Sequence, residues 1–159
     1  MESKQTNFDE QLAIGQDGER EVAMELLKHG IYTMPLYQFT ASMAPVILAM
    51  NSKIVCPDLV GFKNGKTFFV ESKLKHQWVR YGGVETGINQ RHYSQYKALA
   101  DKTGIPVFIV FVQKAEDPTG MYFTEIHNEN TRSWNGYGGS GYVNPPMVFF
   151  TSESLKRIQ

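Results

Sequence analysis

The sequence has almost no cysteine, no long apolar run and no excess of charge of either sign. Cys56 is the one cysteine among 159 residues, so no disulfide can form within the chain, which fits a reducing compartment. No stretch approaches the roughly 20 apolar residues that a membrane-spanning helix needs, and the polar N-terminus lacks the pattern of a signal peptide. We therefore expect a cytoplasmic protein that has no membrane partner.

The formal net charge is zero, with 16 basic and 16 acidic residues. The protein therefore has no global basic field, and a polyanion such as DNA could be held only by a local patch. Such a patch is available between Lys53 and Lys102, where nine basic residues face four acidic ones. A run of charge is also typical of an ordinary solvated surface, so this asymmetry alone does not establish a partner.

Several signatures of enzyme classes are missing. The four histidines have no zinc-ligand spacing, and no Gly-x-Ser-x-Gly sequence is present. The glycine-rich stretch at Gly136–Tyr142 lacks the Gly-Lys-Ser/Thr ending of a phosphate-binding loop. We interpret that stretch as a surface loop, with substrate contact as the alternative.

The local patterns predict one α/β domain over residues 1–159. Asn64-Gly65 between two apolar runs is a strong hairpin signal, and it predicts paired strands over Ile54–Phe62 and Lys66–Leu74. Asn89 and Gly104 are suitable caps for a helix over residues 90–103. The continuous apolar run at Ile105–Val112 predicts a strand that is covered on both faces.

The remaining segments give weaker signals. Pro35 suggests that the strand predicted over Ile31–Phe39 lies at a sheet edge. Residues 40–52 are treated as an insertion of uncertain structure, in which Pro45 could open a short helix. The other predicted elements are a helix over Phe8–His29, strands over Met121–Ile126 and Met147–Phe150, and a terminal helix from Ser152 to Ile158.

The predicted hairpin carries three charged residues where apolar ones are expected. They are Asp58, Glu71 and Lys73. Glu71 and Lys73 are two apart, so on a strand they point to the same face, and Asp58 lies on the partner strand. Charges in such places are usually paired, metal-bound or catalytic. Two carboxylates and an ammonium could hold a divalent cation and a water, whereas a simple salt-bridged hairpin is the alternative.

Two further features lie near this hairpin in sequence. Glu19 follows Gly18 in the first predicted helix, where, taken alone, it is best interpreted as a solvated acid near the positive end of the helix dipole. After the hairpin, residues 76–83 combine Trp78, Arg80 and Tyr81 with two glycines. Aromatic and basic side chains together suit stacking on nucleic-acid bases, and a loop packed onto the core is an equally good interpretation.

The order of these motifs resembles the PD-(D/E)xK nuclease superfamily. The resemblance rests on Gly18-Glu19, Pro57-Asp58, Glu71-Ser72-Lys73 and a following helix that carries glutamine, and it covers residues 15–112. It is closest to the Holliday-junction-resolvase-like and virus-type replication-repair branches. It implies a restriction-endonuclease-like α/β core, in which a mixed central β-sheet is flanked by helices.

The resemblance also implies roles for individual residues. Asp58 and Glu71 would bind Mg²⁺, or Mn²⁺ in its place, with the backbone carbonyl of Ser72 as a further ligand. Glu19 would reach the metal directly or through water, and Lys73 would orient or help to deprotonate the attacking water. The residues expected to contact DNA are Lys75, Trp78, Arg80, Tyr81, Gln90, Arg91 and Gln95, and either Gln90 or Gln95 would support the site.

The implied activity is that of a magnesium-dependent endodeoxyribonuclease that leaves a 5′-phosphate and a 3′-hydroxyl, as in DNA repair and recombination. Cleavage of branched DNA is the first expectation because no sequence-reading motif is visible, and a homodimer or higher homo-oligomer would supply two sites for two strands. One alternative is a sequence-specific restriction or homing endonuclease that reads bases through residues 40–52 or 136–142. Another is a nucleic-acid-binding module that keeps this fold without cutting.

Overall fold

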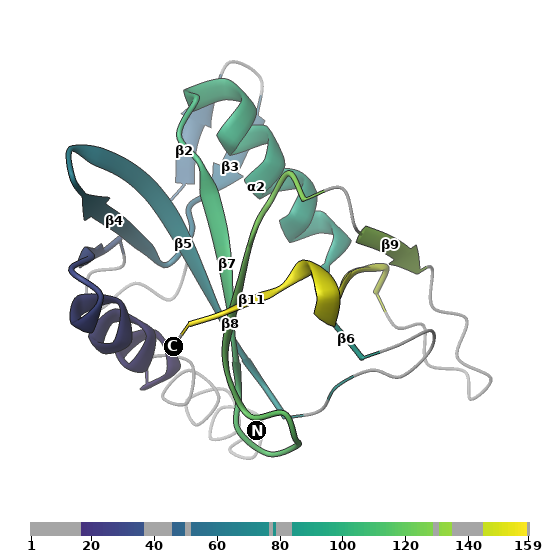
Figure 1. Ribbon diagram of the computed structural model, residues 1–159. Coiled ribbons are helices and arrows are strands. Elements are labelled where there is room, and N and C mark those ends of the chain that lie inside the picture. The colour runs from purple at the N-terminus through teal and green to yellow at the C-terminus, as the bar shows by residue number, and fades with distance from the viewer. Residues whose placement is uncertain are drawn as a thin grey trace, which may run out of the picture.

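The computed structural model describes residues 17–36, 46–49, 52–76, 78, 84–128, 131–134 and 145–158. Its main feature is a six-stranded sheet with the order β1-β4-β5-β7-β8-β11 (Figure 1). The strands β5 and β7 are parallel, whereas the other neighbours in this sheet are antiparallel. The sheet is therefore mixed, as the sequence predicts.

The hairpin of β4 (Leu59–Lys63) and β5 (Lys66–Lys75) is built as the Asn-Gly signal indicates. Lys63 pairs with Lys66, and the two turn residues Asn64 and Gly65 have φ values of 50° and 74°. Positive φ at both positions is the requirement of a type I′ turn, whose twist matches that of the flanking strands. This turn fixes the register that places the charged residues of β5.

The edge strand and the start of the hairpin show how proline shapes this part of the chain. Strand β1 (Tyr32–Pro35) pairs only with β4 among the described strands, so the predicted edge position is confirmed. The strand predicted over Ile54–Phe62 is instead divided. Ile54 belongs to β3 (Ser52–Val55), and β4 begins after a break at residues 56–58, where Pro57 has no N–H to donate.

The helix α2 (Gln90–Thr103) crosses over between the parallel strands β5 and β7 (Val107–Gln113). Its bounds are those predicted from its caps. The Asn89 side chain accepts a hydrogen bond from the N–H of Arg91 at 2.8 Å, and Gly104 has a φ of 67° with its N–H bonded to the carbonyl of Ala100. Both caps satisfy backbone groups that the helix itself leaves unpaired.

Helices cover the two faces of the main sheet. On one face, Tyr96 and Leu99 of α2 pack with Val60, Phe69 and Ile109. On the other face, the helix over residues 17–28 packs through Val22 and Leu26, together with strand residues Leu59, Val70 and Val110. Successive residues of β4, β5 and β7 thus alternate between two hydrophobic clusters, which is the pattern of a sheet buried on both sides. The expected α/β core is confirmed (Figure 1).

The C-terminal helix predicted from Ser152 is wrong. Residues Ser152–Ser154 form a single 3₁₀ turn, and Lys156–Arg157 form strand β11, which pairs with β8 (Gly120–Glu125) at the sheet edge. The N–H of Ile158 also donates to the carbonyl of Met121 at 2.9 Å. The open edge of β8 offers backbone partners that a seven-residue helix could not match.

Two smaller sheets complete the described structure. Strand β6 (Glu85–Asn89) and strand β9 (Thr131–Trp134) flank the predicted strand β10 (Met147–Thr151), and neither flanking strand was predicted. In the region of the expected insertion, β2 (Val46–Ala49) pairs with β3. The short helix considered at Pro45 is therefore replaced by a strand. The glycine-rich loop at 136–142 lies outside the described residues.

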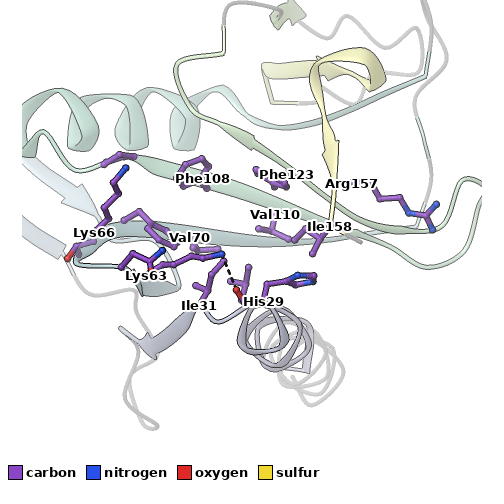
Figure 2. Close-up of a pocket in the computed structure, with 15 residues that line it drawn as sticks. His29, Ile31, Lys63, Lys66, Val70, Phe108, Val110, Phe123, Arg157 and Ile158 are labelled. Atoms are coloured by element: carbon purple, nitrogen blue, oxygen red, sulfur yellow. Dashed lines mark hydrogen bonds between the residues drawn. The ribbon is translucent and has the colours of Figure 1, made fainter.

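A groove of about 670 Å³ lies on the face of the sheet that the helix over residues 17–28 partly covers (Figure 2). Apolar side chains such as Phe68, Phe108 and Phe123 line it, together with basic residues that include Lys66 and Arg157. Neither Asp58 nor Glu71 lines this groove. This groove is therefore separate from the carboxylates of Asp58 and Glu71.

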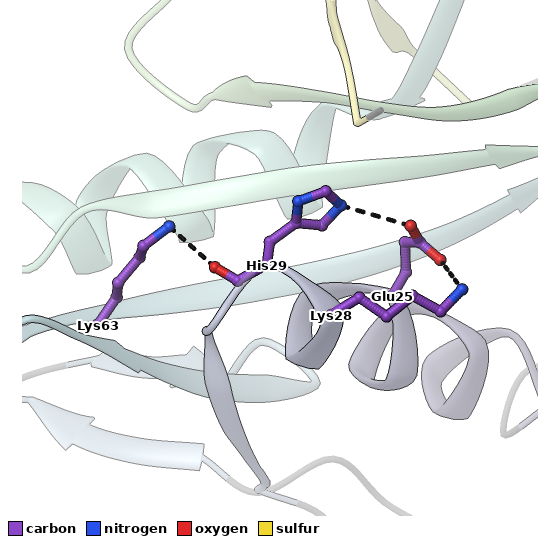
Figure 3. Close-up of polar contacts among 4 residues, drawn as sticks. All are labelled: Glu25, Lys28, His29 and Lys63. Atoms are coloured by element: carbon purple, nitrogen blue, oxygen red, sulfur yellow. Dashed lines mark hydrogen bonds and ion pairs between the residues drawn. The ribbon is translucent and has the colours of Figure 1, made fainter.

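Polar contacts fasten the end of the first described helix to the hairpin (Figure 3). Lys63 Nζ donates to the carbonyl of His29 at 3.0 Å, and Glu25 contacts both Lys28 at 2.7 Å and His29 at 3.4 Å. A cation bonded to a carbonyl at a helix C-terminus is favoured by the helix dipole.

No helix in the described parts of the chain is long and apolar enough to cross a membrane.

Candidate active site

Asp58 and Glu71 lie opposite each other at the start of β4. Leu59 pairs with Val70, so extending the register by one residue places Asp58 beside Glu71. The Asp58 Oδ2 atom accepts a hydrogen bond from the backbone N–H of Ser72 at 2.7 Å. Both carboxyl groups are buried, with Asp58 7% and Glu71 2% exposed. The structure thus brings the two predicted metal-binding carboxylates together.

Lys73 joins this pair from the same strand. Its Nζ atom donates to Glu71 Oε1, and 29% of its side chain is exposed. The second oxygen of Glu71, Oε2, is buried and has no hydrogen-bond partner. A buried carboxylate oxygen without a donor is costly, so native sites usually supply a partner such as a water or an ion. Glu71 therefore binds Lys73 through Oε1, and its Oε2 is left to accept from a water or to bind an ion.

Glu19 approaches the same group from a different element. It lies near the start of the helix over residues 17–28, where the buried Gly18 packs against the end of β5. A Cβ added to Gly18 would lie 3.8 Å from Leu74 Cβ and 4.0 Å from Ser72 Oγ. The helix thus packs directly on the strand that carries Glu71. This packing is what brings a residue distant in sequence to the hairpin.

The charges of these groups perturb one another. Burial, together with the charge of Glu71, raises the pKa of Asp58 to about 8. Burial and Glu71 also raise the pKa of Glu19. Burial alone would lower the pKa of Lys73, but the carboxylates of Glu71 and Asp58 outweigh it, so that its pKa is raised. The site therefore has more negative charge than one ammonium can compensate.

These residues fit a hard divalent cation. Carboxylate and carbonyl oxygens are the ligands that Mg²⁺ prefers, and Mg²⁺ keeps several waters when few protein ligands are present. The unpartnered Glu71 Oε2 and the uncompensated charge near Asp58 are what a bound cation would satisfy. Within the described residues, no three His, Cys, Asp or Glu side chains form a metal-binding cluster. The groups available to a cation here are the carboxylates of Asp58 and Glu71 and nearby backbone oxygen, and Glu19 is close enough to interact electrostatically with Glu71.

His92 is a neighbour that the sequence-based reasoning missed. It lies in the first turn of α2, half-buried, with its ring centroid 6.0 Å from that of Tyr96. Burial and the ammonium of Lys73 lower its pKa, which places it within electrostatic range of the candidate site. Helical spacing could have shown that His92 faces inward, because His92, Tyr96 and Leu99 are at positions i, i+4 and i+7 of one helix face.

The residues expected to contact DNA have different environments. Gln90 and Arg91 are exposed at the start of α2, and Lys75 and Gln95 are half-buried. Gln95 Oε1 is buried without a hydrogen-bond partner. Because Gln90 is exposed and Gln95 is directed inward, Gln95 is the better candidate to support the site.

Trp78 requires a correction. It is 5% exposed and packs edge-on against Tyr122 with ring centroids 5.3 Å apart. Its backbone N–H donates to Glu116 Oε2 at 3.0 Å, and its Nε1 donates to the carbonyl of Pro118 at 3.3 Å. The ring is therefore part of the core and is not available to stack on a base. Arg80 and Tyr81, from the same segment, lie outside the described residues.

Comparison with known proteins finds similar solved structures, whereas no family or curated sequence is matched. No family model and no curated protein matches this chain. Among solved structures, Hjc, a Holliday junction resolvase from the archaeal hyperthermophile Archaeoglobus fulgidus, superposes with a TM-score of 0.53. The match covers 88% of this chain and 90% of that chain at 14% sequence identity. At this identity the likeness shows that the two chains share a fold.

Proposed function

We propose that this protein is a metal-dependent endonuclease of the PD-(D/E)xK superfamily that hydrolyses phosphodiester bonds in DNA. The observation that carries the proposal is the arrangement of Asp58, Glu71 and Lys73 at one end of the β4–β5 hairpin, with Glu71 Oε2 lacking a partner. The fold shared with a Holliday junction resolvase supports it.

The residues have separate tasks in this proposal. Asp58 and Glu71 would hold Mg²⁺, or Mn²⁺ in its place, together with the Ser72 carbonyl, and Glu19 would act through a water molecule. A cation bound there would lower the pKa of the attacking water and offset the charge of the scissile phosphate. Lys73 keeps its proton because the neighbouring carboxylates raise its pKa. It is therefore suited to donate to a phosphate oxygen on which charge develops.

Branched DNA is the proposed substrate. The solved structure that shares the fold is named as a Holliday junction resolvase. The formal net charge of zero also argues against tight binding along any duplex, because non-specific binding depends on neutralising many phosphates. Cutting both strands of a junction needs two sites, so we propose a homodimer as the active form. We also propose that the protein is soluble and cytoplasmic.

A substrate panel tests this function. The protein is incubated with a four-way junction, a flap, a linear duplex and a single strand, each with Mg²⁺, with Mn²⁺ and with a chelator. We expect metal-dependent cutting of the branched DNAs, with 5′-phosphate ends, and no cutting by the Lys73→Ala variant. Glu153→Gln, which removes an exposed charge from the 3₁₀ turn, is the matched control and should cut normally. Binding without cutting across the panel would instead indicate a non-catalytic DNA-binding module.

A further inference from the structure

A second positive charge, that of Lys75, lies next to the candidate site and has no carboxylate partner among the residues that the structure describes. Lys75 is the last residue of β5, on the same face as Lys73, and its Nζ lies 6.0 Å from the centroid of the Phe111 ring. Among the described residues, no carboxylate forms an ion pair with it, since Glu71 is engaged by Lys73. Burial, and then the charge of Lys73, lower its pKa to about 8. A half-buried ammonium in this position favours an anion from outside the chain.

The neighbouring strand presents a second donor that lacks an acceptor. Gln113 is the last residue of β7 and is directly paired with Lys75 across the parallel strands. It is two residues after Phe111, so it points to the same face of the sheet as Lys75. The side chain is 2% exposed, and its Nε2 is buried without a hydrogen-bond partner. Buried donors of this kind destabilise a protein unless something supplies an acceptor.

We propose that Lys75 and Gln113 form a binding subsite for a substrate phosphate next to the one that is cut. This inference rests on the proposed nuclease function. Lys75 would supply the charge and Gln113 a directed N–H, which together are the donors that a phosphate oxygen accepts from. Gln113 has not been assigned any role from sequence, because nothing in the apolar run that precedes it marks it as functional.

The geometry of β5 explains why the phosphate would be a neighbouring one. Lys73 and Lys75 are two residues apart on one face of a strand, which separates their Cα atoms by roughly 6.6 Å. Successive phosphates along a nucleic-acid strand have a similar separation. Lys73 is joined to the metal-binding carboxylates through Glu71, so it belongs to the reacting phosphate. Lys75 lies one step farther along β5, toward the end of the parallel strands.

Binding measured without cleavage tests the subsite. Lys75→Met and Gln113→Leu are each made in an Asp58→Asn background, and the affinity for a fluorescein-labelled four-way DNA junction is measured by anisotropy over a range of salt. We expect Lys75→Met to lower affinity about tenfold and to reduce the slope of log affinity against log salt by about one. Gln113→Leu should lower affinity about threefold to tenfold with an unchanged slope, because it removes no charge.

Thermal unfolding of the same variants separates binding from structure. Gln113→Leu removes a buried donor without a partner, and Lys75→Met removes a half-buried ammonium for which the described residues give no ion pair, so we expect each to raise Tm by about 2–4 °C while weakening binding. A structural role for either residue predicts the reverse, because its loss would lower Tm. A fall in Tm for Lys75→Met or Gln113→Leu, with affinity unchanged, would overturn the subsite.

A matched lysine on the same strand provides the control. Lys66 is exposed at the opposite end of β5, so Lys66→Met should leave the affinity and the salt slope unchanged. An equal loss of affinity in Lys66→Met would show that general charge is responsible, and it would overturn the subsite. If wild-type protein cuts DNA but Lys75→Met binds normally, the subsite fails while the nuclease function stands. If the Asp58→Asn protein and the wild type both fail to bind the junction, the proposed function itself fails.

Discussion

Asp58 and Glu71 are an unfavourable pair for the stability of the fold. They lie beside each other in a buried place, and within the described parts of the chain Lys73 is the one residue whose ammonium contacts them, through Glu71. Buried like charges raise the pKa of at least one member, which is what burial and Glu71 do to Asp58. Local arrangements that reduce stability are concentrated at functional sites, so the cost supports a functional interpretation of the pair.

The raised pKa of Asp58 predicts a pH dependence of stability. The folded pKa is about 8, compared with an ordinary value of 3.8, so between these limits the unfolded chain releases a proton that the folded protein retains. The contribution of Asp58 to stability without metal should therefore be most favourable near pH 4 and become less favourable as the pH rises toward 8. Asp58→Asn removes the titrating group, and at pH 8 it should be more stable than wild type by about 1–3 kcal/mol.

Urea unfolding at pH 5, 6.5 and 8 in the presence of a chelator measures this effect. The advantage of Asp58→Asn should shrink as the pH falls, and Mg²⁺ should stabilise wild type more than the variant at pH 8. An advantage that is independent of pH would show that Asp58 does not titrate in this range. Glu153→Gln serves again as the control for loss of an acidic group at an exposed position.

The contact between Lys73 and Glu71 can be tested by a double-mutant cycle. Lys73→Met leaves Glu71 buried with no cation, so it should lower the free energy of unfolding by about 3 kcal/mol. Adding Glu71→Gln removes the stranded charge and should restore most of that stability, because the two residues interact directly. Chemical denaturation of the two single variants and the double variant measures the coupling. Additive effects would mean that the Lys73–Glu71 contact does not form in solution.

At the scale of residues, the sequence predicted that Asp58, Glu71 and Lys73 lie close together. It did not predict the environments of Trp78 and His92. The two-residue spacing of Glu71 and Lys73, and the hairpin that returns to Asp58, follow from strand periodicity alone. The environment of Trp78 could not be predicted, because its partners Glu116 and Tyr122 come from a much later part of the chain, in β8 and the segment before it. His92 was overlooked for the same reason, since its relation to Lys73 depends on how α2 packs.

Elements with strong local signals were predicted well, and elements that depend on partners were not. The Asn64-Gly65 turn and the caps of α2 are determined by the conformational preferences and hydrogen bonds of the residues that form them. Strand β11 has two residues and exists because β8 offers an edge. Strand β6 contains Gly87, where a Cβ would lie 2.5 Å from the Val148 carbonyl of β10, so its glycine reflects close packing and not a turn.

The N-cap of α2 can be tested by a single substitution. Asn89→Ala removes the side-chain oxygen that accepts from the Arg91 N–H, so we expect a loss of about 1 kcal/mol. For a chain of this length the loss corresponds to a fall in Tm of about 2–4 °C by calorimetry. Asn89→Asp keeps an acceptor at the same place and should retain most of the stability. If both variants melted alike and below wild type, the side-chain oxygen at position 89 would not be what stabilises the start of α2.

The candidate site and the largely apolar groove lie on opposite faces of one sheet. The candidate site lies on the face that α2 covers, whereas the groove with Lys66 and Arg157 lies on the face of the helix over residues 17–28 (Figure 2). The formal net charge of zero gives no indication of how charged residues are distributed between the two faces. The fold class was predictable because the apolar run of β7 and the hairpin signal of β4 and β5 are visible in the sequence, and a solved structure at 14% identity shares the fold. The choice of substrate does not follow from the fold.

Metal-dependent nicking of supercoiled plasmid DNA tests the central claim most directly. The initial rate is measured over a Mg²⁺ titration for wild type, Asp58→Asn and Glu153→Gln. We predict that wild type and Glu153→Gln nick the plasmid with the same saturable dependence on Mg²⁺. Asp58→Asn should lose at least about 100-fold in rate while staying folded. Equal nicking by Asp58→Asn, or nicking by wild type that persists in a chelator, would contradict the account.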